Sequence, residues 1–427
     1  MALILAATGL VYYAVNAEGQ RVLRADLNDG GIWVSNQEES LIGRQNKPLS
    51  QLDTAVPASS VDADVLQQGA AVIAVDNSAF TLTPVSASLG KAVDDDKIAT
   101  AGPAVLGGGT VAVVNTETGE VWATRVDPAI GVNSLAELDR EAKPLARAGA
   151  GAELAASSTG VVFASTPGAD EVTVVPPSEA GFGKATTQSL HAAVSDGITD
   201  VSAVGVVPAV LDATNRLILP AASVSVSPSV DEPTRLQQPG PSRDRALVET
   251  SQGLITVRLE DGSVESVVEG VSGTPSAPVR LGPCDWGVWS NGREATVAVA
   301  CDGQDPVVGP PFEVPSDAVL VFRVNRNDLL LNDVKNGGVW NVDGANATEI
   351  TDWESLQNDQ EPDDSNPNDS EAPEIKQNPD ARDDDLGARA GFTTVLNVLD
   401  NDLVSGGGVL AIVETKGLED EAGLTVR

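Results

Sequence analysis

The segment TVAVVNTETGEVWAT, residues 110–124, is the clearest structural unit of this 427-residue chain. Val111 and Val113 alternate with smaller residues, a polar loop of Asn, Thr, Glu and Gly follows, and the run 121–123 resumes an extended pattern. Two extended runs around such a loop are typical of a β-hairpin, and Gly119 suits a left-handed position in its turn. The segment therefore predicts two paired strands.

Looser copies of this hairpin recur along the chain. They lie near Val11, Val72, Val162, Val210, Val248, Val288 and Val321. The spacing is roughly 40 to 50 residues and shortens to about 33 at the end, which is the period of four-stranded blades around an axis. We therefore predict an all-β fold with a β-propeller over residues 11–356. Merging the first hairpin with the last favours seven blades, and six or eight stay open.

The two ends of the propeller should meet, because an open ring would leave exposed sheet edges. The matched sequences GGIW and GGVW end at Trp33 and Trp340. We expect residues 12–34 to pair with residues 319–342, in the same blade or in adjacent blades. Between hairpins we expect loops at residues 88–103, 127–152 and 227–244.

The charge of the chain excludes some partners. There are 62 acidic and 26 basic residues, which give a formal net charge of -36. Nucleic acid and an anionic membrane surface would both repel such a protein, so neither is expected as a partner. The charge fits a secreted or high-salt protein, and its simplest explanation is a solvated acidic surface that maintains solubility.

The N-terminal run 2–15, ALILAATGLVYYAV, is apolar but too short to span a bilayer, and it lacks the basic region of a signal peptide. It is either the outer end of a signal-anchor helix that starts upstream or the first strand of the fold. We assign residues 1–10 to a remnant of a membrane anchor or signal segment. Membrane attachment would then come from an upstream anchor.

The C-terminal part differs in composition from the propeller. Residues 357–380 are acidic and Pro-rich, as in an extended linker. In residues 381–427, the element FTTVLNVLDNDLV resembles the opening strands of bacterial immunoglobulin-like and cadherin-like repeats, through its Val-Leu-x-Asn-Asp core. A full repeat of that kind has about seven strands, and about three are expected here. We therefore predict an incomplete immunoglobulin-like domain that is not stable alone.

The rest of the chain carries a second resemblance. Its segments ADLNDGGIWV, LIGRQNKPLSQLD and NGGVWNVDG are similar to the N-terminal part of actinobacterial membrane-anchored surface proteins. In those proteins, immunoglobulin-like or fibronectin type III modules follow a propeller-like head. The resemblance implies an extracytoplasmic, non-catalytic cell-surface protein that presents such modules for adhesion or for interaction with a protein or a cell-wall glycan.

Catalytic motifs are few. The one histidine, His191, is expected to be an ordinary loop or strand residue, and no G-x-S-x-G elbow occurs. A carboxylate pair for glycoside hydrolysis stays open, because the separation of two carboxylates is a three-dimensional property. The alternative function is therefore a carbohydrate-active enzyme, which acidic residues clustered at one end of the channel would favour. No catalytic residue and no cofactor other than calcium is predicted.

Calcium has two candidate sites. Clusters of carboxylates occur at residues 94–96 and near the C-terminus, at Asp383, Asp384, Asp385, Asp400 and Asp402. Carboxylate oxygens suit calcium, although neither cluster follows the EF-hand spacing. The alternative is that these residues cap turns with their side chains.

The two cysteines, Cys284 and Cys301, flank a hairpin signal. Folding the segment about the bond between Gly292 and Arg293 sets the cysteines directly opposite each other. Opposed residues of an antiparallel pair lie close enough for a disulfide. Two free thiols or a metal pair are the alternatives. A disulfide would indicate an oxidising compartment.

Overall fold

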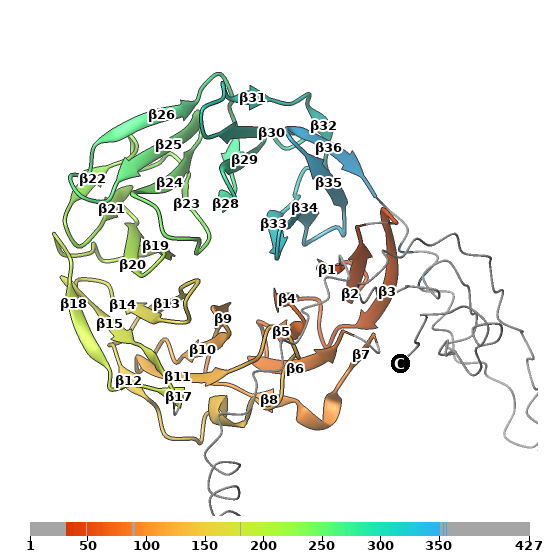
Figure 1. Cartoon of the computed structure of the whole chain (residues 1–427), viewed down its shortest axis with the longest axis vertical. Coiled ribbons are helices and arrows are strands. Elements are labelled where there is room, and N and C mark those ends of the chain that lie inside the picture. The colour runs from red at the N-terminus through yellow and green to blue at the C-terminus, as the bar shows by residue number, and fades with distance from the viewer. Residues whose placement is uncertain are drawn as a thin grey trace, which may run out of the picture. The chain divides into compact units, whose positions relative to one another are not determined.

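The computed structural model describes residues 31–47, 49–87, 90–179 and 181–350, together with Trp353 and Leu356. They all belong to the first of two compact units, residues 1–361. The described strands form eight antiparallel sheets and one small hairpin, β16–β17. The sheets follow one another around a ring, as Figure 1 shows. The fold is an eight-bladed β-propeller.

The blades are numbered in chain order. Blade 1 contains β1 (Gly31–Asn36), β2 (Leu41–Asn46) and β3 (Gln51–Pro57), and blade 2 contains β4 (Ala63–Gln68), β5 (Ala71–Asp76), β6 (Thr81–Ser86), β7 (Lys91–Ala92) and β8 (Ile98–Ala99). Blade 3 contains β9 (Ala104–Gly107), β10 (Thr110–Val114), β11 (Glu120–Arg125) and β12 (Ala146–Arg147). Blade 4 contains β13 (Glu153–Ala156), β14 (Val162–Ser165), β15 (Glu171–Val175) and β18 (Thr186–Ser189), together with the hairpin β16 (Pro177–Ser178) and β17 (Gly181–Phe182). Blade 5 contains β19 (Ile198–Val204), β20 (Val207–Asp212), β21 (Arg216–Ile218) and β22 (Ser223–Ser225), and blade 6 contains β23 (Thr234–Leu236), β24 (Arg245–Thr250), β25 (Gly253–Arg258) and β26 (Val264–Val268). Blade 7 contains β27 (Thr274–Pro275), β28 (Val279–Leu281), β29 (Cys284–Ser290), β30 (Glu294–Cys301), β31 (Val307–Val308) and β32 (Phe312–Glu313). Blade 8 contains β33 (Leu320–Asn325), β34 (Asp328–Asp333), β35 (Val339–Asp343) and β36 (Asn346–Glu349).

The hairpin at residues 110–124 forms as predicted. β10 pairs with β11, with Val114 opposite Val121. Gly119 has a φ of +70°, and a Cβ there would lie 2.1 Å from the carbonyl oxygen of Gly149. Glycine is therefore required at this position by both backbone conformation and space.

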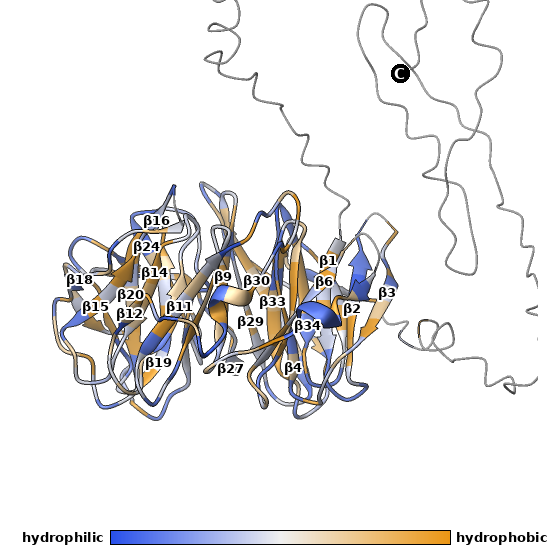
Figure 2. Cartoon of the chain, turned by 90° about the horizontal axis from the view of Figure 1, so that it is seen from below, coloured by the Kyte–Doolittle hydropathy of each residue, from blue (hydrophilic) through white to orange (hydrophobic). Residues whose placement is uncertain are grey.

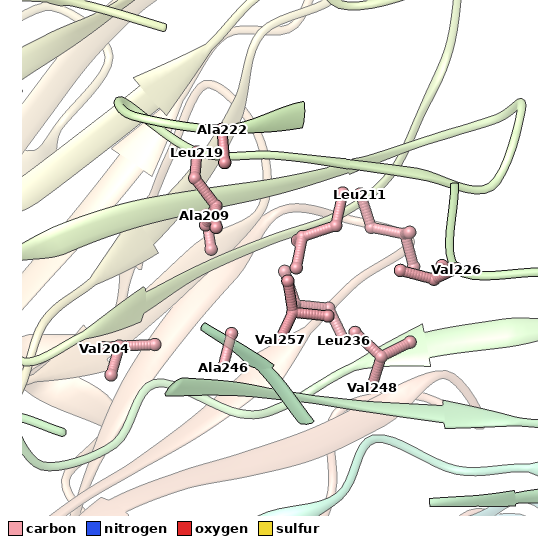
Figure 3. Packing of buried hydrophobic residues seen from close by; sticks show 11 residues of the cluster. Val204, Ala209, Leu211, Leu219, Ala222, Val226, Leu236, Ala246, Val248 and Val257 are labelled. Atoms are coloured by element: carbon pink, nitrogen blue, oxygen red, sulfur yellow. The ribbon is translucent and has the colours of Figure 1, made fainter. Parts of the chain in front are cut away.

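Side-chain alternation along the strands supplies the core. Each of the eight interfaces between neighbouring blades contains one cluster of buried apolar side chains. In β1, Ile32 and Val34 pack toward blade 8, whereas Trp33 between them packs toward blade 2. Figure 3 shows the interface of blades 5 and 6, where Leu211 and Val257 come from opposite sides. The middle strands of a blade are buried on both faces, and strands such as β5 and β10 are therefore apolar on both sides. Figure 2 shows hydrophobic stretches, drawn in orange, in many strands of the ring.

Polar side chains also shape the hairpins. In six blades, an Asn or Asp that ends a strand or directly follows one accepts a hydrogen bond from a backbone N–H two or three residues further on. These residues are Asn36, Asp76, Asn115, Asp212, Asn291 and Asp333. Such side chains close a turn locally, so the sequence of each of these six blades itself favours the strand–turn–strand unit.

The ring closes between adjacent blades, as one of the two expected arrangements. β1 of blade 1 lies beside β33 and β34 of blade 8, which is also seen in Figure 1. The ring has eight blades, a number that the prediction left open beside the preferred seven, because residues 31–57 form a blade of their own beside blade 8. The matched GGxW sequences are not equivalent in structure, because Trp33 lies in the interface of blades 1 and 2 and Trp340 in that of blades 7 and 8.

Some segments expected as loops contain short strands, and other predicted segments lie outside the described residues. The stretch 227–244, expected as a loop, contains β23, the inner strand of blade 6; residues 88–103 and 127–152 also contain short strands and 3₁₀ turns. No helix among the described residues is both long enough and apolar enough to cross a membrane. Residues 1–30, with the expected anchor remnant 1–10, the hairpin expected near Val11 and most of the closing segment 12–34, lie outside the described residues. So do the linker 357–380 and the predicted immunoglobulin-like segment 381–427.

Candidate functional site at the inner strands

Charged side chains gather on three successive inner strands of the ring. Glu153 opens β13, Asp200 lies near the start of β19, and Arg235 lies in β23. Figure 1 shows these strands as neighbours on the inner side of blades 4, 5 and 6. Because each inner strand repeats the same placement in its blade, residues near their starts lie toward the same end of the ring. We call these three residues the inner-strand cluster.

An ion pair organises the cluster. Arg235 Nη2 lies 2.9 Å from Asp200 Oδ1, and the side chains are 46% and 15% exposed, respectively. The backbone N–H of Leu236 donates a hydrogen bond of 3.0 Å to Asp200 Oδ2. Asp200 is thus held by blade 6 through both of its oxygens, while half of Arg235 stays in contact with solvent.

Burial changes the proton affinity of both carboxyl groups. Burial raises the pKa of Asp200 to about 6, against the lowering effects of Arg235 and of the Leu236 N–H. The pKa of Glu153 rises to about 7, through burial and then the negative charge of Asp200, with Arg235 opposing. The side chain of Glu153 is exposed, whereas that of Asp200 is mostly buried. Near neutral pH, the cluster can exchange protons and can offer a cation and carboxylates to one polar ligand.

Glu249 is a third carboxyl group near Arg235, but its contacts are structural. It is fully buried in β24 and accepts backbone N–H hydrogen bonds from blade 7, from Val288 at 3.2 Å and Ser276 at 3.4 Å. Burial raises its pKa well above the usual value, although these hydrogen bonds and Arg235 act in the opposite direction. Glu249 therefore joins blade 6 to blade 7.

A mostly buried arginine, Arg323, serves ring closure. Arg323 of β33 forms an ion pair with Asp64 of blade 2 and donates to the carbonyl oxygen of Val65 at 3.2 Å. It also donates to Ser35 Oγ of blade 1 at 3.4 Å. Its guanidinium thus joins three blades.

The structure describes three of the candidates from the sequence: the two cysteines, His191 and residues 94–96. Cys284 and Cys301 form a disulfide, and they face each other in the predicted register of β29 and β30. His191 is an exposed residue whose backbone N–H donates to Leu219. The residues 94–96 form an exposed 3₁₀ turn.

Calcium binding stays a prediction. Within the described part of the chain, no group of three or more acidic, His or Cys side chains is placed to hold a metal ion. The other candidates, Asp383, Asp384, Asp385, Asp400 and Asp402, lie outside the described residues.

Sequence reasoning did not find the inner-strand cluster. Glu153 and Asp200 are two of 62 acidic residues, and Arg235 lies in a stretch interpreted as a loop. No local sequence pattern marks these residues, because each is far from the others in sequence and only the folded ring brings them together. An acidic or basic residue at the start of an inner strand is the feature that would have pointed to them.

The fold and this cluster define the class of the protein, an eight-bladed β-propeller with charged groups on its inner strands. No protein-family model and no curated protein sequence matches the chain.

Solved structures share the architecture. The dihydro-heme d1 dehydrogenase NirN in complex with DHE is 13% identical, with a TM-score of 0.50 over 78% of this chain and 75% of that one. The computationally designed Ika8 protein is 11% identical, with a TM-score of 0.51 over 74% and 94%. BamB from Moraxella catarrhalis is 13% identical, with a TM-score of 0.41 over 73% and 91%. At these identities, the likeness to NirN and to Ika8 shows the fold alone.

Proposed function

We propose that this protein is an extracytoplasmic, non-catalytic binding or scaffolding protein, whose propeller head presents further modules at a cell surface. The observation that supports it best is the Cys284–Cys301 disulfide. Such bonds persist in oxidising compartments and are rare in the cytosol. The net charge of -36 agrees with a solvated surface outside the cell.

The partner is proposed to be a protein or a cell-wall glycan. Immunoglobulin-like modules after residue 381 and an upstream membrane anchor are part of this proposal through the sequence resemblance described above.

The compartment is tested in the cells that make the protein. A membrane-impermeant amine-reactive label should modify the protein in intact cells and should leave a cytosolic marker unlabelled. Thiol titration after unfolding without reductant should find no reactive thiol. Protection from the label in intact cells together with two reactive thiols per chain would refute the proposal.

Binding is tested with the purified full chain and isolated cell walls. Co-sedimentation with the walls, without release of new reducing ends, is the expected result. A control with walls stripped of protein separates a glycan partner from a protein partner. Release of reducing ends would contradict the non-catalytic role.

A carbohydrate-active enzyme is the second candidate, and the inner-strand cluster favours it. Glu153 and Asp200 have raised pKa values of about 7 and 6, and an acid that keeps its proton near neutral pH is suited to protonate a glycosidic oxygen. If this candidate holds, Glu153→Gln and Asp200→Asn each abolish release of reducing ends while binding to the walls persists. Unchanged release in both variants would exclude this pair.

A further inference from the structure

A small surface pocket lies on blade 6, away from the inner-strand cluster. It has a volume of about 280 Å³ and is lined by Arg245, Thr256, Arg258, Ser263, Val264 and Glu265. All six residues come from β24, β25 and β26 or from the turn between the last two. Pockets for small molecules begin at roughly this size, so the pocket suits a ligand of about one sugar ring.

The strand register places two like charges together in this pocket. Arg245 lies directly opposite Arg258. Like charges directly opposite each other destabilise a sheet unless something neutralises them. Asp244 lies 3.7 Å from each guanidinium, and Arg245 also pairs with Glu265. These carboxylates orient the arginines, whose side chains stay 34% and 42% exposed.

A buried hydroxyl is the second, independent observation. Thr256 lines the pocket, yet the residue is only 4% exposed. Among the described residues, its Oγ1 has no hydrogen-bond partner. Burying a hydroxyl without a partner is unfavourable, and native proteins usually satisfy such groups with protein, water or a ligand. Thr256 therefore indicates that this pocket holds a polar group.

The position of the hydroxyl follows from the sheet. Thr256 is opposite Leu247 on one side and opposite Glu265 on the other. Leu247 packs with Trp289 of blade 7, so this row of residues is on the face of blade 6 that looks toward blade 7. The hydroxyl, the carboxylate of Glu265 and the arginine pair thus share one side of the sheet.

We propose that this pocket binds a small hydroxylated carboxylic acid, and a uronic acid is the example that fits a pocket with room for about one sugar ring. Arg245 and Arg258 present guanidinium donors that match a carboxylate. Glu265 accepts hydrogen bonds from ligand hydroxyls, and the Thr256 hydroxyl donates or accepts them. Ser263 Oγ instead donates to Asp261 and accepts from Arg258 Nε, so it helps to orient that arginine. A monoanion is favoured over phosphate because Glu265 and Asp244 already place negative charge beside the arginines.

This inference deepens the proposed binding role, because acidic sugars occur in surface glycans. It rests on the proposed function only for where the ligand comes from, not for the pocket itself. The two fail separately. Surface exposure is measured on cells, whereas the pocket is measured on the purified full chain. A cytosolic location would refute the first and leave the second in place.

The experiment is isothermal titration with four probes: glucuronate, glucose, acetate and inorganic phosphate. Glucuronate should bind at least about tenfold more tightly than the other three, which corresponds to about 1.4 kcal/mol. Absence of binding by all four, or equal binding of glucuronate and acetate, would overturn the proposal. Tighter binding of phosphate would replace it with a simple anion site.

Variants separate the site from the fold. Thr256→Val should weaken glucuronate binding about tenfold, while thermal stability is kept or raised, because an unpartnered hydroxyl is removed. Thr81→Val is the matched control, since Thr81 Oγ1 of blade 2 is also buried without a partner in the described part of the chain, and it should leave binding unchanged. Arg258→Gln should also weaken binding at least about tenfold. Unaltered binding in both pocket variants would exclude the site.

Discussion

Asn332 of blade 8 pairs with the backbone of Ser35 in blade 1 through both ends of its side-chain amide. Ser35 N donates to Asn332 Oδ1 at 2.9 Å, and Asn332 Nδ2 donates to the carbonyl oxygen of Ser35 at 3.0 Å. The two residues are 297 positions apart in sequence and fully buried. The amide thus substitutes for a peptide group of a neighbouring strand, at the only interface that joins the first blade to the last.

The first prediction concerns this pair. Asn332→Ala should lower the free energy of unfolding by about 2 to 4 kcal/mol, because two buried backbone groups of Ser35 lose their partner. Urea denaturation measures the change. Asn77→Ala, at an exposed turn position, is the control and should shift stability by less than about 0.5 kcal/mol. Equal stability of the two variants would mean that water replaces the amide without cost.

The sequence predicted the propeller well because the repeat is local. A hairpin such as residues 110–124 shows its strands by alternation and its turn by Gly119, and both features are properties of neighbouring residues. The disulfide followed for the same reason, since register in a hairpin is set by its turn. The number of blades depends instead on how distant ends meet, and the similarity of Trp33 to Trp340 was misleading there.

The inner-strand cluster was outside the reach of sequence reasoning. β23 is a strand of three residues, Thr234–Leu236, in a polar stretch, residues 227–244, that contains four prolines. Its extended conformation depends on pairing with β24 more than on its own composition. Because the position of Arg235 depends on this tertiary pairing, its ion pair with Asp200 could not be anticipated.

The second prediction concerns the disulfide. Replacing Cys284 and Cys301 together with alanine should lower the free energy of unfolding by about 3 kcal/mol, as expected for the 17-residue separation of the two cysteines. The ring should persist, because β29 and β30 keep their other paired residues. Urea denaturation of the oxidised protein, the reduced protein and the double variant measures this. Loss of the β-sheet circular dichroism signal on reduction would contradict it.

The third prediction concerns pH. The pKa of Asp200 is about 6 in the folded protein and 3.8 for the unperturbed group. The folded state therefore binds more protons between these values, and stability should fall as pH rises from about 4 to about 6. Over two pKa units, the loss attributable to Asp200 is at most about 3 kcal/mol.

Two variants test the contribution of Asp200. Asp200→Asn cannot ionise, so urea denaturation across this pH range should show a smaller fall than in the original protein. Arg235→Met removes the cation that lowers the pKa of Asp200, so the fall should extend to higher pH. A parallel pH profile in all three proteins would show that Asp200 titrates as it does in the unfolded chain.

The last prediction concerns Glu249, whose carboxyl group is buried between blades 6 and 7. Glu249→Gln keeps an oxygen that accepts from Val288 N and Ser276 N and removes the group that burial keeps from ionising. Its stability should stay within about 1 kcal/mol of the original protein at pH 5 and exceed it at pH 8, because a raised folded-state pKa makes the carboxyl group destabilising as pH rises. Glu249→Leu fills similar space but leaves two N–H groups without an acceptor, at a cost of about 2 to 5 kcal/mol. Urea denaturation at both pH values compares the three proteins. If the leucine variant were as stable as the glutamine variant, Glu249 would not be the bridge between these blades.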